Sequence, residues 1–94
     1  LTAGDDGVDP AAALGALASR GARVVLCEGG PTLLGELVAA DLLDELCLTI
    51  TPQLVAGDRL RITEGPALTP PLSMRLRHLL EHDGELFARY TRGT

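Results

Sequence analysis

Residues 23–34, which read RVVLCEGGPTLL, decide the fold of this chain. The run before Glu28 is apolar at successive positions, as in a strand that is covered on both faces, and such strands belong to parallel sheets. Two glycines then break the run, and Pro31 stands at a favoured first position of a helix. We therefore expect a strand from Arg23 to Cys27 and a helix from Pro31 to about Ala40.

Two further patterns lie downstream of this helix. Leu46–Thr51 predicts a second strand, so that strand, helix and strand form a βαβ unit with a right-handed crossover. Near the end of the chain, Met74–Leu80 and Leu86–Tyr90 flank Asp83-Gly84, which is a strong signal for a two-stranded hairpin. The segment between is irregular, although Leu60–Ile62 could form a short edge strand.

Upstream, residues 1–8 are rich in glycine and aspartate and indicate a linker or loop. Asp9-Pro10 is a helix start, because aspartate caps free N–H groups and proline is favoured at the first position. This helix is expected to reach about Arg20, with Gly21 as its stop.

The composition favours an α/β fold. The chain has 94 residues, enough for one domain at most, and is 46% hydrophobic but only 2% aromatic, so its core must be aliphatic. The order of elements predicts a mixed sheet with a parallel βαβ core, closed by an antiparallel C-terminal hairpin. These strands alone would leave long unpaired edges, so we expect the fold to be incomplete in this chain.

Charge and cysteine content narrow the function. A formal net charge of -5 without a basic run argues against a nucleic-acid or anionic membrane surface and favours a small-molecule ligand. No apolar stretch approaches a membrane span and no leader precedes the first element, so a soluble, cytoplasmic protein is expected. We interpret Cys27 and Cys47 as reduced core residues, with a cross-strand disulfide as the alternative.

The bend after the first strand is the feature that could carry chemistry. Glycines at the carboxyl end of a parallel strand let a ligand approach the backbone closely. The following helix directs its free N–H groups and positive dipole end to the same point, which favours an anion such as a pyrophosphate. The Thr32 hydroxyl would add a donor. A plain strand-to-helix turn is the alternative, since this is neither the three-glycine dinucleotide fingerprint nor a lysine-bearing phosphate loop.

Four segments in order, Val24–Leu34, Leu42–Leu46, Thr49–Leu54 and Gly84–Tyr90, resemble the C-terminal half of the riboflavin-biosynthesis pyrimidine reductase domain. The resemblance implies a dihydrofolate reductase-like fold, of which residues 1–94 would be the C-terminal portion. It further implies an NADPH-dependent reductase that acts on an aminopyrimidine ribosyl phosphate. We also expect the protein to form a homodimer.

The resemblance also assigns roles to the bend. In that family the two glycines lie against the pyrophosphate and nicotinamide of NADPH, often through an unusual peptide geometry, and the helix start contacts phosphate. The implied cofactor-binding residues are Gly29, Gly30, Pro31, Thr32 and Leu33. Glu28 would be the catalytic residue at the junction of nicotinamide and substrate, although a strand-end acid satisfied by backbone N–H groups or by solvent is the alternative.

Other functions and sites have weaker support in the sequence. A dihydrofolate- or pteridine-type reductase, or a non-catalytic nucleotide-binding or dimerisation module, would fit the same scaffold. We expect no metal site: His78 and His82 lie in a predicted strand and its turn, and the acidic cluster Asp41, Asp44 and Glu45 is interpreted as a solvated turn. Arg75 and Arg77 should mark the polar face of their strand.

Overall fold

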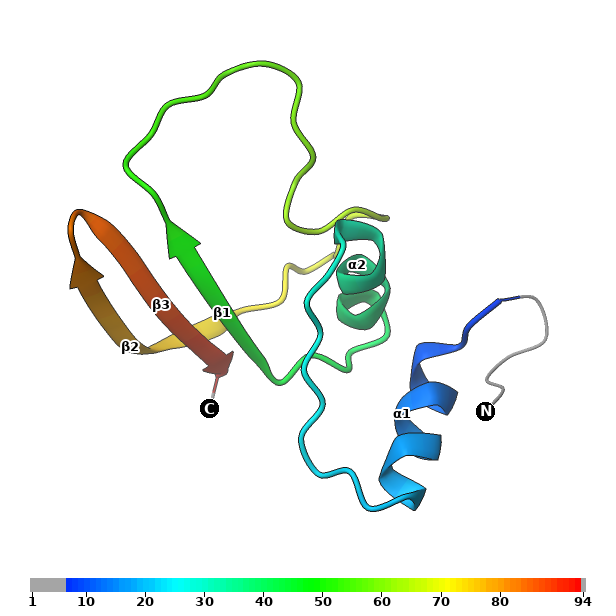
Figure 1. The fold of residues 1–94 in the computed structure, drawn as a ribbon. Helices are drawn as coiled ribbons and strands as arrows, with labels where there is room; N and C mark the ends of the chain where they lie inside the picture. The colour runs from blue at the N-terminus through cyan, green and yellow to red at the C-terminus, as the bar shows by residue number, and fades with distance from the viewer. Residues whose placement is uncertain (1–6, 94) are drawn as a thin grey trace. The chain divides into compact units, whose positions relative to one another are not determined.

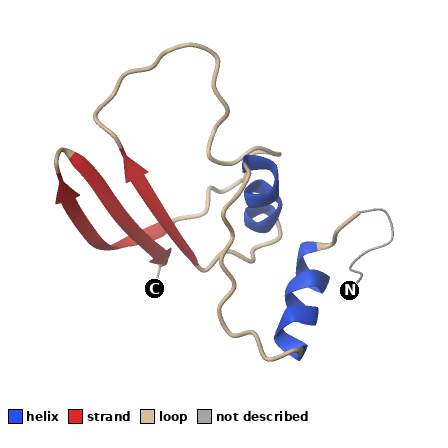
Figure 2. Cartoon of the chain, viewed as in Figure 1, coloured by secondary structure: helices blue, strands red, loops and turns tan. Residues whose placement is uncertain are grey.

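The computed structural model describes residues 7–93, which form two compact units (Figure 1). The helical unit holds the residues up to Leu42 together with Leu60–Pro66, and contains helices α1 (Pro10–Ser19) and α2 (Pro31–Ala39). The sheet unit holds Leu43–Arg59 and the residues from Ala67 onward. Its strands are β1 (Glu45–Ile50), β2 (Met74–His82) and β3 (Glu85–Arg92), coloured red in Figure 2.

Helix α1 starts and stops where the sequence predicted. Asp9 is its N-cap, and the Asp9 carboxylate Oδ1 accepts hydrogen bonds from the backbone N–H groups of Ala11 at 3.0 Å and Ala12 at 3.4 Å. Pro10 occupies the first turn. After Arg20 the chain turns at Gly21, whose φ of +94° glycine adopts without steric cost.

Helix α2 also begins at its predicted proline and ends close to the predicted Ala40. Beyond its last turn, Asp41 has a φ of +61° and donates its N–H to the Val38 carbonyl at 3.1 Å, which ends the helix. Leu34 and Leu37 are half-buried, whereas Leu33 is 42% exposed and so lies outside the buried side of the helix.

The prediction of a strand from Arg23 to Cys27 is wrong for the described residues, because no hydrogen-bonded strand forms there. The segment carries no helix or strand assignment, no segment of residues 7–93 pairs with it, and Val24 and Leu26 are 90% and 80% exposed. The βαβ unit and its parallel pair are therefore not formed among these residues. An apolar run encodes an extended backbone, but a strand also needs a neighbour that completes its hydrogen bonds. Leu60–Ile62 likewise forms no strand.

The sheet is antiparallel throughout the described residues, with β3 in the centre of the order β1-β3-β2 (Figure 1). The predicted hairpin between β2 and β3 is confirmed. Asp83 and Gly84 both have positive φ, at +50° and +82°, which is the requirement of the tight two-residue turns that join antiparallel strands. The predicted β1 is confirmed too, but it pairs with β3 and not with a parallel partner.

One face of the sheet is mostly apolar and the other mostly polar, and a β-bulge preserves this division along β2. Glu81 and Arg92 lie on the mostly apolar face, and Leu80 and Phe87 on the mostly polar one. Leu76 opposes Tyr90 and His78 opposes Arg89, so Arg77 is the extra residue between them. Strict alternation would put His78 on the apolar face, and the bulge moves Leu79 there instead, opposite Ala88. Ala88, at 6% exposure, is the buried apolar residue of the described chain. The other members of this apolar face are Leu46, Leu48, Ile50, Met74 and Leu86.

The same alternation explains the cysteines. Both thiols are free, in agreement with the expectation of reduced residues, but only Cys27 is half-buried. Cys47 is exposed, so its prediction as a core residue is wrong. Its register position opposite Arg89 puts it on the polar face, because its neighbours in β1 occupy the apolar one.

Candidate functional site

The bend between the extended segment and α2 presents bare backbone to solvent. Glu28, Gly29 and Gly30 are all exposed, and Gly29 has a φ of +96°, a conformation that favours glycine. The Gly29–Gly30 peptide bond is cis, an unusual geometry of the kind that the resemblance implied. A Cβ on Gly29 or on Gly30 would meet nothing within 4 Å. A ligand could therefore approach both residues without displacing protein atoms.

The first turn of α2 has unsatisfied donors. Its N-cap is Gly30, which makes no side-chain cap, and Pro31 has no N–H group to offer. The Gly30 carbonyl accepts from Leu34 N–H at 3.0 Å, but the N–H groups of Thr32 and Leu33 have no hydrogen-bond partner among residues 7–93. Such a helix start, with its positive dipole end, suits a phosphate group.

Helix α1 is an internal comparison for this arrangement. Both helices begin with proline after a polar or glycine residue, yet only α1 has a carboxylate on its first N–H groups, from Asp9. In α2 the corresponding position belongs to a glycine, which has no side chain to accept hydrogen bonds from these N–H groups. The donors of α2 therefore stay available to an external anion, while those of α1 do not.

Residues Leu60–Pro66, which we call the strap, contact α2 within the helical unit. Glu64 donates its backbone N–H to the carbonyl of Pro31 at 3.0 Å. Its own carbonyl lies over Gly35, the buried residue of α2, so closely that a Cβ there would be 1.8 Å from the oxygen. The Glu64 side chain turns back to accept the backbone N–H of Arg61 at 3.0 Å. This contact was not predicted from the sequence, where its one local signal was a glycine inside an otherwise apolar helix.

Glu28 stands directly before the glycine bend. It is exposed, and no hydrogen bond or ion pair connects its carboxylate to any residue of the described chain. The interpretation of a strand-end acid held by neighbouring backbone N–H groups is therefore not what the structure shows. A solvated carboxylate next to the glycines can still accept hydrogen bonds from a ligand. Its predicted catalytic role stays a prediction.

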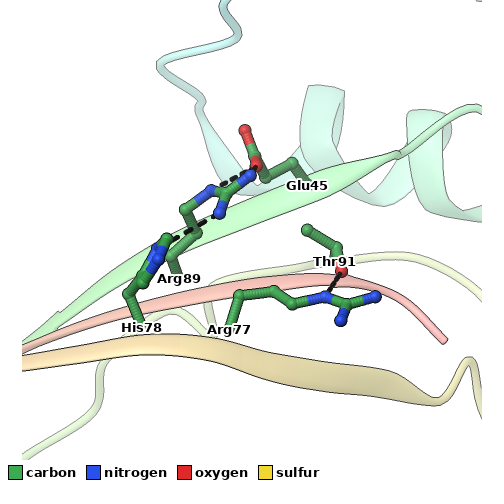
Figure 3. Close-up of polar contacts among 5 residues, drawn as sticks. All are labelled: Glu45, Arg77, His78, Arg89 and Thr91. Carbon is green, nitrogen blue, oxygen red and sulfur yellow. Dashed lines mark hydrogen bonds and ion pairs between the residues drawn. The ribbon is translucent and has the colours of Figure 1, made fainter.

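A second polar cluster lies on the sheet and was missed from the sequence. Arg89 on β3 donates through Nε to Glu45 Oε1, and its Nη2 forms an ion pair with the same oxygen (Figure 3). Arg89 Nη1 lies 3.2 Å from Nδ1 of His78 on the other neighbouring strand. Arg77 donates through Nε to Thr91 Oγ1 at 2.7 Å. Glu45 neutralises Arg89, which stabilises the pairing of β1 with β3 and leaves Arg89 little capacity for a ligand, whereas Arg77 bonds to the neutral hydroxyl of Thr91.

These contacts correct the prediction for Glu45 and support the one for Arg77. Glu45 belongs to an ion pair and not to a solvated acidic turn, because β1 begins at this residue. Arg77 lies on the polar face as predicted, at the bulge. His82 Nε2 lies 3.3 Å from Asp83 Oδ2 on a highly exposed pair, and within residues 7–93 no three metal-ligating side chains gather.

Comparison with known families gives one match. A family described as the RibD C-terminal domain matches residues 2–87, which leaves out only the first residue and the last seven. The matched range contains the glycine bend, α2, the strap and most of the sheet. No match is found among curated proteins. None of the helices in the described part of the chain has the length and apolarity to span a membrane.

Proposed function

Because the chain belongs to the RibD C-terminal domain family, a reductase-type domain of riboflavin biosynthesis, we propose that it takes part in NADPH-dependent reduction of an aminopyrimidine ribosyl phosphate. The observation that carries the proposal is the glycine bend followed by an uncapped helix start. This combination offers both parts of a dinucleotide site: bare backbone for close approach and N–H donors for phosphate.

The residues of the bend fit NADPH. The N–H groups of Thr32 and Leu33 would bind its pyrophosphate, and each hydrogen bond to a charged oxygen contributes about 1.5–3 kcal/mol. The dipole of α2 would add about 0.3–1 kcal/mol. Gly29 and Gly30 would lie beneath the dinucleotide, where any side chain would occupy its space. When bound, NADPH supplies the hydride.

Glu28 would act on the substrate side of the same bend. Its exposed carboxylate can accept a hydrogen bond from a pyrimidine N–H or amino group and so orient the ring. It can also hold the proton that must accompany hydride delivery to a carbonyl or imine-like carbon. Gly30 and Glu28 are two residues apart in the chain, so one short segment would serve both cofactor and substrate.

Gly30→Ala in the full-length protein tests this proposal. Gly30 has a φ of −79°, which alanine adopts readily, and the new Cβ would meet no protein atom within 4 Å. The fold should therefore be unaffected. A methyl group on the binding surface should lower the affinity for NADPH at least about tenfold, or about 1.4 kcal/mol. Gly15→Ala is the matched control, because Gly15 lies in α1 with nothing within 4 Å of its Cβ position.

Fluorescence titration measures the NADPH affinity of both variants. An unchanged NADPH affinity for folded Gly30→Ala would show that the bend does not hold the cofactor. Turnover assays then distinguish between the two possible substrates, and between an enzyme and a non-catalytic module. Reduction of a dihydropteridine in place of the aminopyrimidine would favour the pteridine-type reductase, and NADPH binding without any turnover would favour a non-catalytic module. The expected homodimer is part of the proposal, and sedimentation of the same samples tests it.

A further inference from the structure

The strap contacts α2 at the carbonyl whose peptide group carries Thr32 N–H, one of the two proposed phosphate donors. Glu64 N–H donates to Pro31 O at 3.0 Å, and Pro31 is the first residue of the helix. The contact is close because residue 35 is glycine, whose missing side chain leaves room for the Glu64 carbonyl. A carbonyl oxygen has two lone pairs, so Pro31 O can accept from the strap as well as from its own helix.

The same peptide group carries the Pro31 carbonyl and the Thr32 N–H. Because a trans peptide is planar, these two bonds point in opposite directions, and fixing one fixes the other. A hydrogen bond accepted by the oxygen also polarises the group and makes its N–H a stronger donor. The Glu64 bond therefore acts on Thr32 N–H, which has no partner among residues 7–93.

We propose that Glu64 is a positioning residue: through its backbone N–H it orients and strengthens the Thr32 N–H that binds the cofactor phosphate. Gly35 is the residue that permits this approach. The proposal rests on the proposed function, since it assigns Thr32 N–H to the phosphate of NADPH. If the strap only packed against α2, its loss would lower stability without changing the affinity of the folded protein for the cofactor.

Two variants of the full-length protein remove the contact in different ways. Gly35→Ala puts a Cβ 1.8 Å from the Glu64 carbonyl oxygen, so the strap must move away. Glu64→Pro removes the N–H donor itself and leaves Gly35 in place. Gly15→Ala again is the control, since it makes the same substitution in a helix that has no strap contact.

Three measurements are made on each variant that melts cooperatively: NADPH affinity, the kinetic constants, and the amide proton shift of Thr32 in the free protein. We expect both strap variants to bind NADPH about three- to tenfold more weakly, the size of one modest hydrogen-bond effect. The KM for NADPH should rise while kcat stays constant, because the donor acts in binding. The Thr32 amide proton should move upfield, and Gly15→Ala should match wild type in all three.

The outcomes separate the two proposals. If wild type binds NADPH and the folded strap variants bind it equally well, the positioning role is wrong and the proposed function stands. If Gly35→Ala fails to fold, Glu64→Pro alone decides in the same way. If wild type does not bind NADPH at all, the proposed function fails, and the positioning role fails with it.

Discussion

Deleting Arg77 should leave the sheet intact, although it removes a residue from the middle of a strand. Arg77 is the extra residue of the bulge, since its neighbours Leu76 and His78 oppose the consecutive residues Tyr90 and Arg89. Without Arg77, the remaining residues of β2 would form a regular ladder in which every side chain keeps its present face. The deletion would therefore convert the bulged pairing into a regular one without changing which residues oppose each other.

The structure sets the size of the effect. The deletion removes the hydrogen bond from Arg77 Nε to Thr91 Oγ1, which is exposed and so contributes about 0.5 kcal/mol. A deletion of Leu79 is the matched control, because it also yields a regular ladder but places His78 opposite Ala88 on the apolar face. Leu79 is 53% exposed, so its loss removes about half of the roughly 1.5–3 kcal/mol of a buried leucine. Placing an imidazole at this half-exposed position adds about half of the roughly 1–3 kcal/mol that burying an unpaired polar group costs.

Urea unfolding measures the stability of both deletion variants of the full-length protein. We expect the Arg77 deletion to change the free energy of unfolding by less than about 1 kcal/mol, and the Leu79 deletion to lower it by roughly 1–3 kcal/mol. With the same slope for both variants, the Leu79 deletion should have the lower urea midpoint. Equal destabilisation by the two deletions would refute the assignment of Arg77 as the bulged residue and the division of the sheet into faces.

Two further predictions concern the helix cap and the ion pair, beside those made for the glycine bend and the strap. Asp9→Ala should lower the free energy of unfolding by about 0.5–2 kcal/mol in urea titrations, because two backbone donors of α1 lose their acceptor, whereas Asp9→Ser should recover most of the loss. Glu45→Gln should lower it by less than about 1 kcal/mol, since the Arg89 and Glu45 side chains are 41% and 44% exposed. That difference should shrink in 1 M salt, and a loss that persisted there would contradict an electrostatic origin.

The elements that could be predicted from the sequence are those that local chemistry encodes. Asp9-Pro10 and Gly30-Pro31 mark helix starts by capping and by the fixed φ of proline. Asp83-Gly84 marks the hairpin because both positions need positive φ. In each case the deciding residues lie within a few positions of one another, so the pattern needed no knowledge of the rest of the chain.

The features that could not be predicted depend on pairing between distant segments. The apolar run Val24–Cys27 indicated a strand, but strand formation requires a neighbour, and hydrophobicity does not say which segment supplies it. The ion pair of Glu45 and Arg89 spans 44 positions and follows from the β1–β3 register. The contact between Glu64 and Pro31 joins the strap to a helix more than thirty residues earlier. Such pairs emerge only when the register or the packing is known.

The two helix starts show how a structural signal can be separated from a functional one within a single chain. Proline at the first position sets the helix in both cases, so it carries no information about a ligand. The preceding residue makes the difference: Asp9 satisfies the first donors of its own helix, whereas Gly30 leaves those of α2 without an acceptor in residues 7–93. A carboxylate at position 30 would stabilise α2 by roughly a few tenths of a kcal/mol over the present glycine, which is itself a tolerated N-cap. If the donors of α2 bind the cofactor phosphate, a carboxylate at position 30 would compete with that phosphate for them. Gly30→Asp should therefore raise the stability of the protein while weakening its binding of NADPH.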